Sequence, residues 1–196
     1  MQENNVEKIR MYAQSVTRDT GSHGFDHTKR VVGLCNLIGN REGARMDILI
    51  PAALLHDIAR SAEKERGIPH EAEGAQKAEE FLGSIGYDPA VIPEISGAIR
   101  THRFRSEEKP VSLEAKILSD ADKLDAMGAV GIARTFIRAG EHQGTMEDAV
   151  GHFHDKLLRL HEHMYTGTAQ AIAAERHEIL VQFLRELARE CVSDTP

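Results

Sequence analysis

Two adjacent residues of the chain, His56 and Asp57, carry side chains that could bind a metal ion or transfer protons. They follow the apolar run 52–55, which is predicted to be a buried helical segment. An imidazole and a carboxylate are costly to bury there unless a cation or a hydrogen-bonding group satisfies them. Taken alone, such a pair is more typical of a capped helix end with both side chains exposed. Its chemical meaning therefore depends on the other histidines and aspartates.

Three of these other residues are predicted to face the interior. His27 falls on the apolar stripe of a helix predicted at 26–41, and His102 continues the stripe of a helix predicted at 88–102. For a lone histidine, a hydrogen bond to a backbone carbonyl is an equally good explanation. Asp122 lies on the apolar face of a later helix, and a buried carboxylate requires a cation, either a basic side chain or a metal. Side chains that project inward from facing helices are how helical bundles build metal sites, so these residues predict one.

The elements that must position these residues are predicted to be helices throughout. Apolar residues recur at steps of three and four, and alternating β-branched runs are few. The predicted helices cover about 4–18, 26–41, 47–57, 70–85, 88–102, 112–125, a short segment after Gly128, 145–164 and 168–190. The fold class is therefore predicted to be all-α.

Several residues are predicted to mark the helix ends. Asp47 is expected to cap the third helix with Pro51 in its first turn, and Asp88 to cap the fifth. Ser112 is expected to open the sixth helix. Thr145 begins a capping-box pattern, which predicts one long helix from there to about residue 164.

Length and composition limit the possible functions. A chain of 196 residues fits one domain, and no apolar run reaches the ~18 residues that a membrane span needs. The two cysteines, Cys35 and Cys191, form no paired motif, so we expect both to be inert packing residues of a cytoplasmic protein. Since no apolar run is long enough to span a membrane, we expect no membrane partner. The net charge of −7 argues against a broad nucleic-acid surface but leaves room for a small anionic substrate in a basic pocket.

Three segments resemble the HD-domain superfamily of metal-dependent phosphohydrolases: Phe25 to Val31, Leu54 to Ile58 and Ser119 to Ala126. The similarity continues through Gly128 to Phe136 and to Lys156, Leu157, Leu158 and Arg176. Within the superfamily, the chain therefore resembles the nucleotide pyrophosphohydrolase-like branch. This resemblance implies an HD-domain helical bundle with additional C-terminal helices. The single domain would span 1–196, with its core at about 20–127 and an extension at about 128–191 packed on that core.

The resemblance also implies a ligand set for a divalent metal ion: His27, His56, Asp57 and Asp122. Asp120 and Asp125 are the alternatives in the third segment; the helical stripe favours Asp122 over the former, and the family pattern favours it over the latter. His70 and His102 match positions that hold a second metal in some relatives and contact substrate in others. Manganese, magnesium, iron, cobalt and nickel all suit imidazole and carboxylate ligands.

A metal-dependent phosphohydrolase needs an activated water and positive charge around the phosphates. A divalent ion lowers the pKa of its bound water toward neutrality, and the resulting hydroxide can attack phosphorus. Basic side chains would stabilise the negative charge of the transition state, although any one of them could equally be a solvated surface cation. The candidates are Arg60, Lys64, Lys123, Arg134, Lys156 and Arg176, with His70 as a further substrate contact. We expect Asp57 to orient the water and His102 to protonate the leaving group.

The favoured function is hydrolysis of a nucleotide or related phosphate ester, with a nucleoside or deoxynucleoside triphosphate cleaved to monophosphate and pyrophosphate. One alternative keeps the ligands but holds a pair of irons for oxygenation, as a minority of HD-type proteins do. Another is a nucleotide sensor without turnover. The expected partner is a small nucleotide or phosphate, with no nucleic acid, and the chain is expected to be a monomer or a homodimer.

Overall fold

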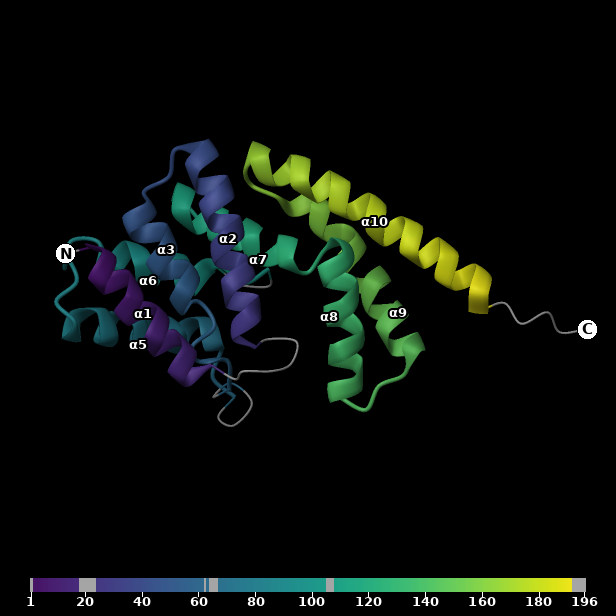
Figure 1. Ribbon diagram of the computed structural model, residues 1–196, viewed down its shortest axis with the longest axis horizontal. Helices are drawn as coiled ribbons and strands as arrows, with labels where there is room; N and C mark the ends of the chain where they lie inside the picture. The colour runs from purple at the N-terminus through teal and green to yellow at the C-terminus, as the bar shows by residue number, and fades with distance from the viewer. Residues whose placement is uncertain (1, 18–23, 62, 64–66, 105–107, 192–196) are drawn as a thin grey trace, which may run out of the picture. The chain divides into compact units, whose positions relative to one another are not determined.

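The computed structural model describes residues 2–17, 24–61, 63, 67–104 and 108–191. In these ranges the regular elements are helices and no strand is present, which confirms the predicted all-α fold (Figure 1). The helices are α1 Gln2–Val16, α2 Phe25–Glu42, α3 Met46–Leu55, α5 His70–Ser84, α6 Ile92–Thr101, α7 Leu113–Asp125, α8 Gly128–Glu141, α9 Met146–Asp155, the 3₁₀-helix η1 Leu157–His163 and α10 Gly167–Cys191.

The chain divides into two compact units, Met1–Asp122 and Lys123–Pro196. Helix α7 contributes to both units, because the division falls inside it. The expected packing of an extension at about 128–191 on a core at about 20–127 stays a prediction.

Helix α3 is the most apolar helix of the first unit and packs against α1, α2 and α6. Its residues 52–55 are all buried, because their small and aliphatic side chains fit between neighbours on several sides. The helix ends at Leu55 and His56 is its C-cap. Helix α3 therefore delivers His56 and Asp57 into the interior, where both are buried.

The start of α3 differs from the prediction, because Asp47 is not its cap. Arg45 precedes the helix in an extended conformation, and Asp47 lies in the first turn. The backbone N–H of Arg45 donates to Glu114 Oε1 at 2.9 Å, and its guanidinium pairs with the Asp47 carboxylate at 3.0 Å. The carboxylate of Asp47 is thus paired with Arg45 rather than with the helix N-terminus.

Pro51 lies inside α3, beyond the first turn in which it was predicted. Proline has no N–H, so the carbonyl four residues earlier, that of Asp47, loses its helical partner. The hydroxyl of Tyr87 donates to this carbonyl at 2.7 Å. A side chain from the segment between α5 and α6 therefore replaces the missing helical hydrogen bond.

Two other predicted helix starts have different outcomes. Helix α6 begins at Ile92 rather than at Asp88, because Asp88 forms a turn: its carboxylate accepts from the N–H of Ala90 at 2.9 Å. Ser112 does cap α7 as predicted, and its hydroxyl accepts from the N–H of Ala115 at 3.1 Å.

The predicted single helix from Thr145 to residue 164 is wrong, because two helices lie there. Thr145 and Asp148 form the predicted capping box, but α9 ends at Asp155. Lys156 then has φ −139° and ψ −57°, which an α-helix cannot continue through. The 3₁₀-helix η1 follows, and its buried residues Leu157 and Leu160 share one side because a 3₁₀-helix repeats every three residues.

The second unit contains a cluster of three phenylalanines, one each from α8, α9 and α10, of which only Phe153 is fully buried. The ring centroids of Phe136, Phe153 and Phe183 lie 5.9 to 6.2 Å apart. Both cysteines are free; Cys35 is buried as expected, whereas Cys191 is exposed at the end of α10 and is not a packing residue. Within the described ranges, no helix is both long and apolar enough to cross a bilayer.

Candidate metal centre

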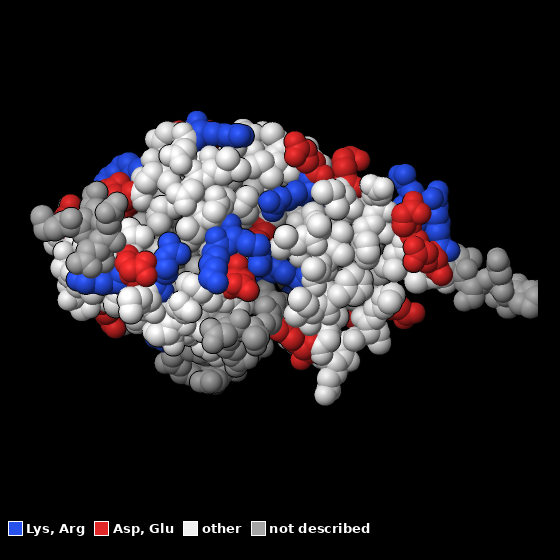
Figure 2. Space-filling model, in the orientation of Figure 1, with Lys and Arg blue, Asp and Glu red and all other residues white. Residues whose placement is uncertain are grey.

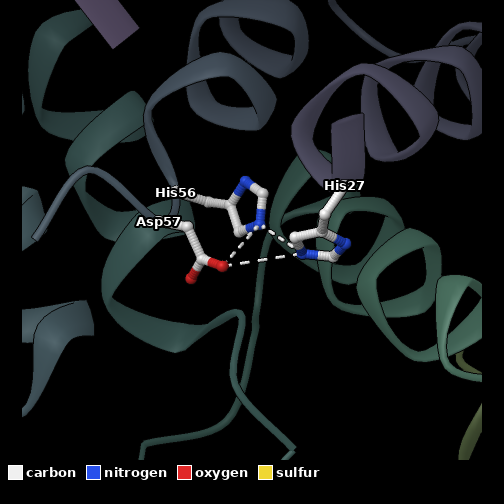
Figure 3. A group of neighbouring side chains, drawn as sticks. All are labelled: His27, His56 and Asp57. Atoms are coloured by element: carbon white, nitrogen blue, oxygen red, sulfur yellow. Dashed lines mark hydrogen bonds and ion pairs between the residues drawn. The ribbon is translucent and has the colours of Figure 1, made fainter. Parts of the chain in front are cut away.

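Four side chains from three helical segments meet inside the first unit: His27 of α2, His56 and Asp57 at the end of α3, and Asp122 of α7. His27 Nε2 lies 3.2 Å from His56 Nε2, 3.6 Å from Asp57 Oδ2 and 3.3 Å from Asp122 Oδ1. Figure 3 shows three of these side chains pointing at one another. The structure therefore brings together the four residues that the sequence suggested as ligands.

Backbone carbonyls orient two imidazoles of this region. His56 Nδ1 lies 2.8 Å from the carbonyl oxygen of Ala53, and His102 Nδ1 lies 2.6 Å from that of Ile99. A carbonyl only accepts, so we assign the proton of each ring to Nδ1. Each Nε2 then keeps a lone pair that could bind a metal. Histidines that bind metals commonly donate their other ring N–H to a backbone carbonyl in this way.

The charge states of the cluster follow from burial and from its neighbours. Burial lowers the pKa of His56, and burial together with nearby His56 lowers the pKa of His102 to about 4. Burial would raise the pKa of Asp57, but the guanidinium of Arg60 and the neighbouring imidazole of His56 hold it well below its ordinary value. At neutral pH these two histidines are therefore neutral and this aspartate is ionised.

Asp122 is held ionised by a different set of neighbours. Burial would raise the pKa of its carboxyl group, but the hydrogen bond with His27 and the nearby imidazoles hold it well below its ordinary value. Its side chain is 28% exposed, which is more than the sequence suggested for a residue on an apolar stripe. Solvent can therefore reach this side of the cluster.

This donor set fits a divalent cation. Two imidazole nitrogens and two carboxylate oxygens are the ligands that manganese, iron, cobalt and nickel accept, and two negative charges balance the ion. Ligands bound at about 2.1 Å to one ion lie about 3.0 to 3.4 Å apart in octahedral or tetrahedral geometry. The separations of 3.2 to 3.7 Å among His27, His56 and Asp57, and of 3.3 Å between Asp122 and His27, lie close to that range.

A second group of possible ligands shares Asp57 with the first. Asp57 Oδ1 lies 3.2 Å from His70 Nε2 and 3.9 Å from His102 Nε2. These three residues are buried and their ligand atoms lie close enough to hold an ion. A third group, Glu63, His70 and Glu71, surrounds the opposite nitrogen of His70. The structure thus places His70 and His102 next to the four predicted ligands.

The candidate phosphate-binding cations fall in both units. Arg60 lies in the first unit, 3.7 Å from Asp57 Oδ1. Lys64 lies outside the described residues. The other four belong to the second unit: Lys123, Arg134, Lys156 and Arg176.

Three of the second-unit cations bind groups within their own unit. Lys123 is buried, and its ammonium donates to the carbonyl of His163 at 2.7 Å. Arg134 pairs with the carboxylate of Asp125 at 2.8 Å. Arg176 donates to the carbonyl of Leu124 at 2.6 Å, and burial lowers the pKa of its guanidinium. Their roles in substrate binding stay predictions.

The two alternative aspartates differ from Asp122 in their surroundings. Asp125 is buried and paired with Arg134. Asp120 is fully buried. Asp122 is the one whose oxygen lies 3.3 Å from His27 Nε2, so its distance to His27 rather than its burial singles it out.

Three charged residues beside His70 were not predicted from the sequence. Glu63 and Glu71 contact His70 Nδ1 at 2.9 and 3.3 Å, and Arg103 contacts both carboxylates at the same distances. A signal was present, because Glu71 and Arg103 directly follow His70 and His102 in the sequence. Charged neighbours of a buried histidine are candidates to orient it.

Comparison with known proteins gives consistent matches. The model of the HD domain family matches residues 24–127. The uncharacterized protein YpgQ of Bacillus subtilis is 37% identical over 192 residues, which cover 94% of this chain and 93% of YpgQ. The crystal structure of YpgQ in complex with ADP has a TM-score of 0.81 at 33% identity, covering 96% of this chain and 98% of that chain. The crystal structure of a predicted HD superfamily hydrolase from an uncultured Thermotogales bacterium has a TM-score of 0.73 at 34% identity. The match covers 94% of this chain and 91% of that chain.

Proposed function

This chain belongs to the HD domain family, and we propose that it is a metal-dependent phosphohydrolase acting on nucleotides. The proposed substrate is a nucleoside or deoxynucleoside triphosphate, and the products are the monophosphate and pyrophosphate. The observation that carries the proposal is that ligand atoms of His27, His56 and Asp57 lie 3.2 to 3.7 Å from one another, with Asp122 Oδ1 3.3 Å from His27 Nε2. Support for a nucleotide comes from the relative YpgQ, which was crystallised with ADP.

Each of the four central residues has a role in this proposal. His27, His56, Asp57 and Asp122 would hold the divalent ion. A bound ion would supply a water of lowered pKa as the nucleophile and a Lewis acid for the phosphoryl oxygen. The carbonyl of Ala53 keeps the His56 ring in the tautomer that such binding needs.

The remaining first-unit residues would act on the substrate and its protons. Arg60 is 31% exposed, so its guanidinium can meet an incoming phosphate while lying 3.7 Å from Asp57. His102 has a pKa of about 4 and is neutral at neutral pH, so it can accept a hydrogen bond through Nε2. The proposed protonation of the leaving group by His102 requires that bound substrate raise this pKa.

The experiment is a hydrolysis assay with a panel of nucleotides and divalent ions, followed by ³¹P NMR. Pyrophosphate and monophosphate as products support the proposal, whereas inorganic phosphate as the first product contradicts the proposed cleavage site. Reaction in ¹⁸O-labelled water locates the attack, because the label enters the monophosphate only if the α-phosphorus is attacked.

Matched variants test the proposed residues. Asp122→Asn removes a proposed ligand, and Asp26→Asn is the control because Asp26 is exposed on α2 beside His27. Loss of turnover in Asp122→Asn but not in Asp26→Asn supports the proposal. A rise in melting temperature with nucleotides but no turnover under any metal would favour a sensor. A coloured preparation bleached by dithionite, without hydrolysis, would favour the di-iron alternative.

A further inference from the structure

The C-terminal end of α7 carries three aspartates, Asp120, Asp122 and Asp125. The last carbonyls of a helix already bear partial negative charge, so carboxylates at this end destabilise it. Asp122 Oδ1 lies 3.3 Å from His27 Nε2, and this approach depends on the end of α7 staying helical. The groups that bind the last turn of α7 therefore bear on the position of Asp122.

Arg134 of α8 binds the final residue of α7 at two atoms. Its Nη1 donates to the carboxylate of Asp125 at 2.8 Å and to the Asp125 carbonyl at 3.1 Å. The side chain of Asp125 is 1% exposed and that of Arg134 is 14% exposed. Removing one member of a buried ion pair leaves the other charge uncompensated, so such a pair is hard to break. Arg134 therefore neutralises one aspartate and also satisfies a carbonyl at the helix end.

Arg176 of α10 reaches the same turn from another helix. Its Nη1 donates to the carbonyl of Leu124 at 2.6 Å, and this carbonyl also accepts from the N–H of Met127 at 3.0 Å. The side chain passes close to Gly128, where a Cβ would lie only 3.0 Å from Arg176 Cγ. Gly128 also has φ +66°, a conformation that favours glycine. A glycine at position 128 thus leaves the space through which Arg176 binds α7.

Lys123 attaches this turn at a third point. It directly follows Asp122, and its buried ammonium donates to the carbonyl of His163 at 2.7 Å. The same ammonium lies 4.3 Å from the ring centroid of Tyr165. The end of α7 is therefore bound by α8, by α10 and by the segment around the end of η1.

We propose that Arg134 and Arg176 are positioning residues for Asp122, because they bind the last turn of α7 and so hold this carboxylate beside His27. An α-helix is stiff over a single turn, so a displacement of its last two residues moves Asp122 as well. This inference rests on the proposed metal centre. It gives the two arginines a role that does not require contact with substrate.

The test measures metal affinity in the absence of nucleotide. The purified full chain is titrated with Mn²⁺ by isothermal titration calorimetry. Arg176→Met keeps an unbranched aliphatic chain beside Gly128 but removes the donor, and Arg134→Met does the same at Asp125. Each is expected to raise the Kd for Mn²⁺ about tenfold, the lower end of the effect of residues that orient metal ligands. Arg176→Lys can still donate to the carbonyl and is expected to stay within about threefold of the wild type.

Two further variants separate this role from a general loss of positive charge. Arg138→Gln is the matched control, because Arg138 is exposed on the same helix as Arg134, and it is expected to keep the wild-type Kd. In an Asp122→Asn background, Arg176→Met is expected to have no further effect on the Kd, because the ligand that it positions is already gone. Circular dichroism establishes that each variant is folded. If Arg134→Met does not fold, the Arg176 variants still decide the test.

Three results would overturn the proposal. An unchanged Kd in folded Arg176→Met is the first, and a raised KM for nucleotide in that variant would then identify a substrate contact. The second is an equal loss of affinity with and without Asp122→Asn, and the third is a raised Kd in Arg138→Gln.

The titration also separates this inference from the proposed function. It uses no nucleotide, so failure of the chain to hydrolyse nucleotides would leave the result unaffected. Binding of no Mn²⁺ by the wild-type chain would refute the metal centre, and this inference with it.

Discussion

The two units contain histidine groups that differ in geometry. In the first unit the neighbouring rings of His27, His56, His102 and His70 meet edge to face, with centroids 5.1 to 5.5 Å apart. In the second unit His161 and His177 lie nearly face to face, with centroids 3.9 Å apart and an angle of 33° between the rings. Edge-to-face rings can direct nitrogens to one point, whereas stacked rings keep their nitrogens in separate planes.

A backbone carbonyl orients a ring in both places, so that feature alone does not distinguish them. His161 Nδ1 lies 2.8 Å from the carbonyl of Leu158, as His56 Nδ1 does from that of Ala53. Among the residues that the structure describes, every group of three or more possible metal ligands lies in the first unit. The comparison teaches that convergent carboxylates, and not the number of histidines, make a metal site.

The largest expected difference is in turnover. His56→Ala and Asp122→Ala each remove a proposed ligand, so hydrolysis of the best substrate should fall by several orders of magnitude. His177→Gln should leave turnover within about twofold, because the stacked pair has no part in the proposed chemistry. Steady-state kinetics after stripping and reloading the metal measures both. Wild-type turnover in either ligand variant would remove that residue from the site.

The next difference is in the acid sensitivity of the metal-free protein. The pKa of His102 is about 4 in the folded chain and 6.5 ordinarily, so below pH 6.5 the unfolded chain binds a proton that the folded chain does not. Stability should therefore fall as the pH is lowered from 6.5 toward about 4, by about 3 kcal/mol for this residue.

Urea unfolding in EDTA at pH 7 and pH 4.5 measures this decline. His102→Gln should show a smaller decline than the wild type. His177→Gln should reduce the decline less, because His177 has a lowered pKa but is only half-buried. An identical decline in His102→Gln and the wild type would contradict the assignment. The carboxyl groups of Asp57 and Asp122 do not interfere, because their stabilisation is lost only below their ordinary value of 3.8.

Metal should stabilise the chain by binding to the site that contains His27 and His56. At Mn²⁺ concentrations about 100-fold above the Kd, binding should add about 2.7 kcal/mol, which raises the Tm by about 5 to 10 °C for a chain of this size. His161→Ala should keep the full rise, and His56→Ala should lose it. Thermal unfolding with and without EDTA measures the difference. An equal rise in both variants would contradict metal binding by His56.

The smallest expected effect lies within the stacked pair. Burial and the neighbouring His161 lower the pKa of His177. His161→Phe keeps a ring in place but removes that neighbour's charge, so the pKa of His177 should rise modestly toward its ordinary value. An NMR titration measures it, with hydrolysis as the control that should not change. An unchanged pKa would mean that burial alone perturbs His177.

The parts of the site that lie on regular helices could be predicted from the sequence. His27 occupies an apolar stripe of α2, so helical periodicity places it inside. His56 and Asp57 follow an apolar run, and their burial is favoured only in combination with the other histidines and aspartates. The contacts of Arg60, Glu63 and Arg103 could not be predicted, because they depend on segments whose conformation has no periodic signal.

The errors in the fold prediction also have physical causes. Leu157 and Leu160 are three residues apart, a spacing shared by α- and 3₁₀-helices, so the break at Lys156 gave no signal. Asp47 and Asp88 are good capping residues that instead bind Arg45 and form a turn. Figure 2 shows both basic and acidic side chains on the visible face, with several basic ones grouped near its centre. The absence of a nucleic-acid partner stays a prediction.

The hydroxyl of Tyr87 links a surface turn to the helix that presents His56 and Asp57. Because Pro51 leaves the Asp47 carbonyl without a helical donor, Tyr87→Phe should cost about 1 kcal/mol or more in unfolding free energy. In a Pro51→Ala background the same change should cost less, since the restored N–H can bond the carbonyl. Positions 51 and 87 are therefore expected to be energetically coupled, so substitutions at one would alter which residues are tolerated at the other.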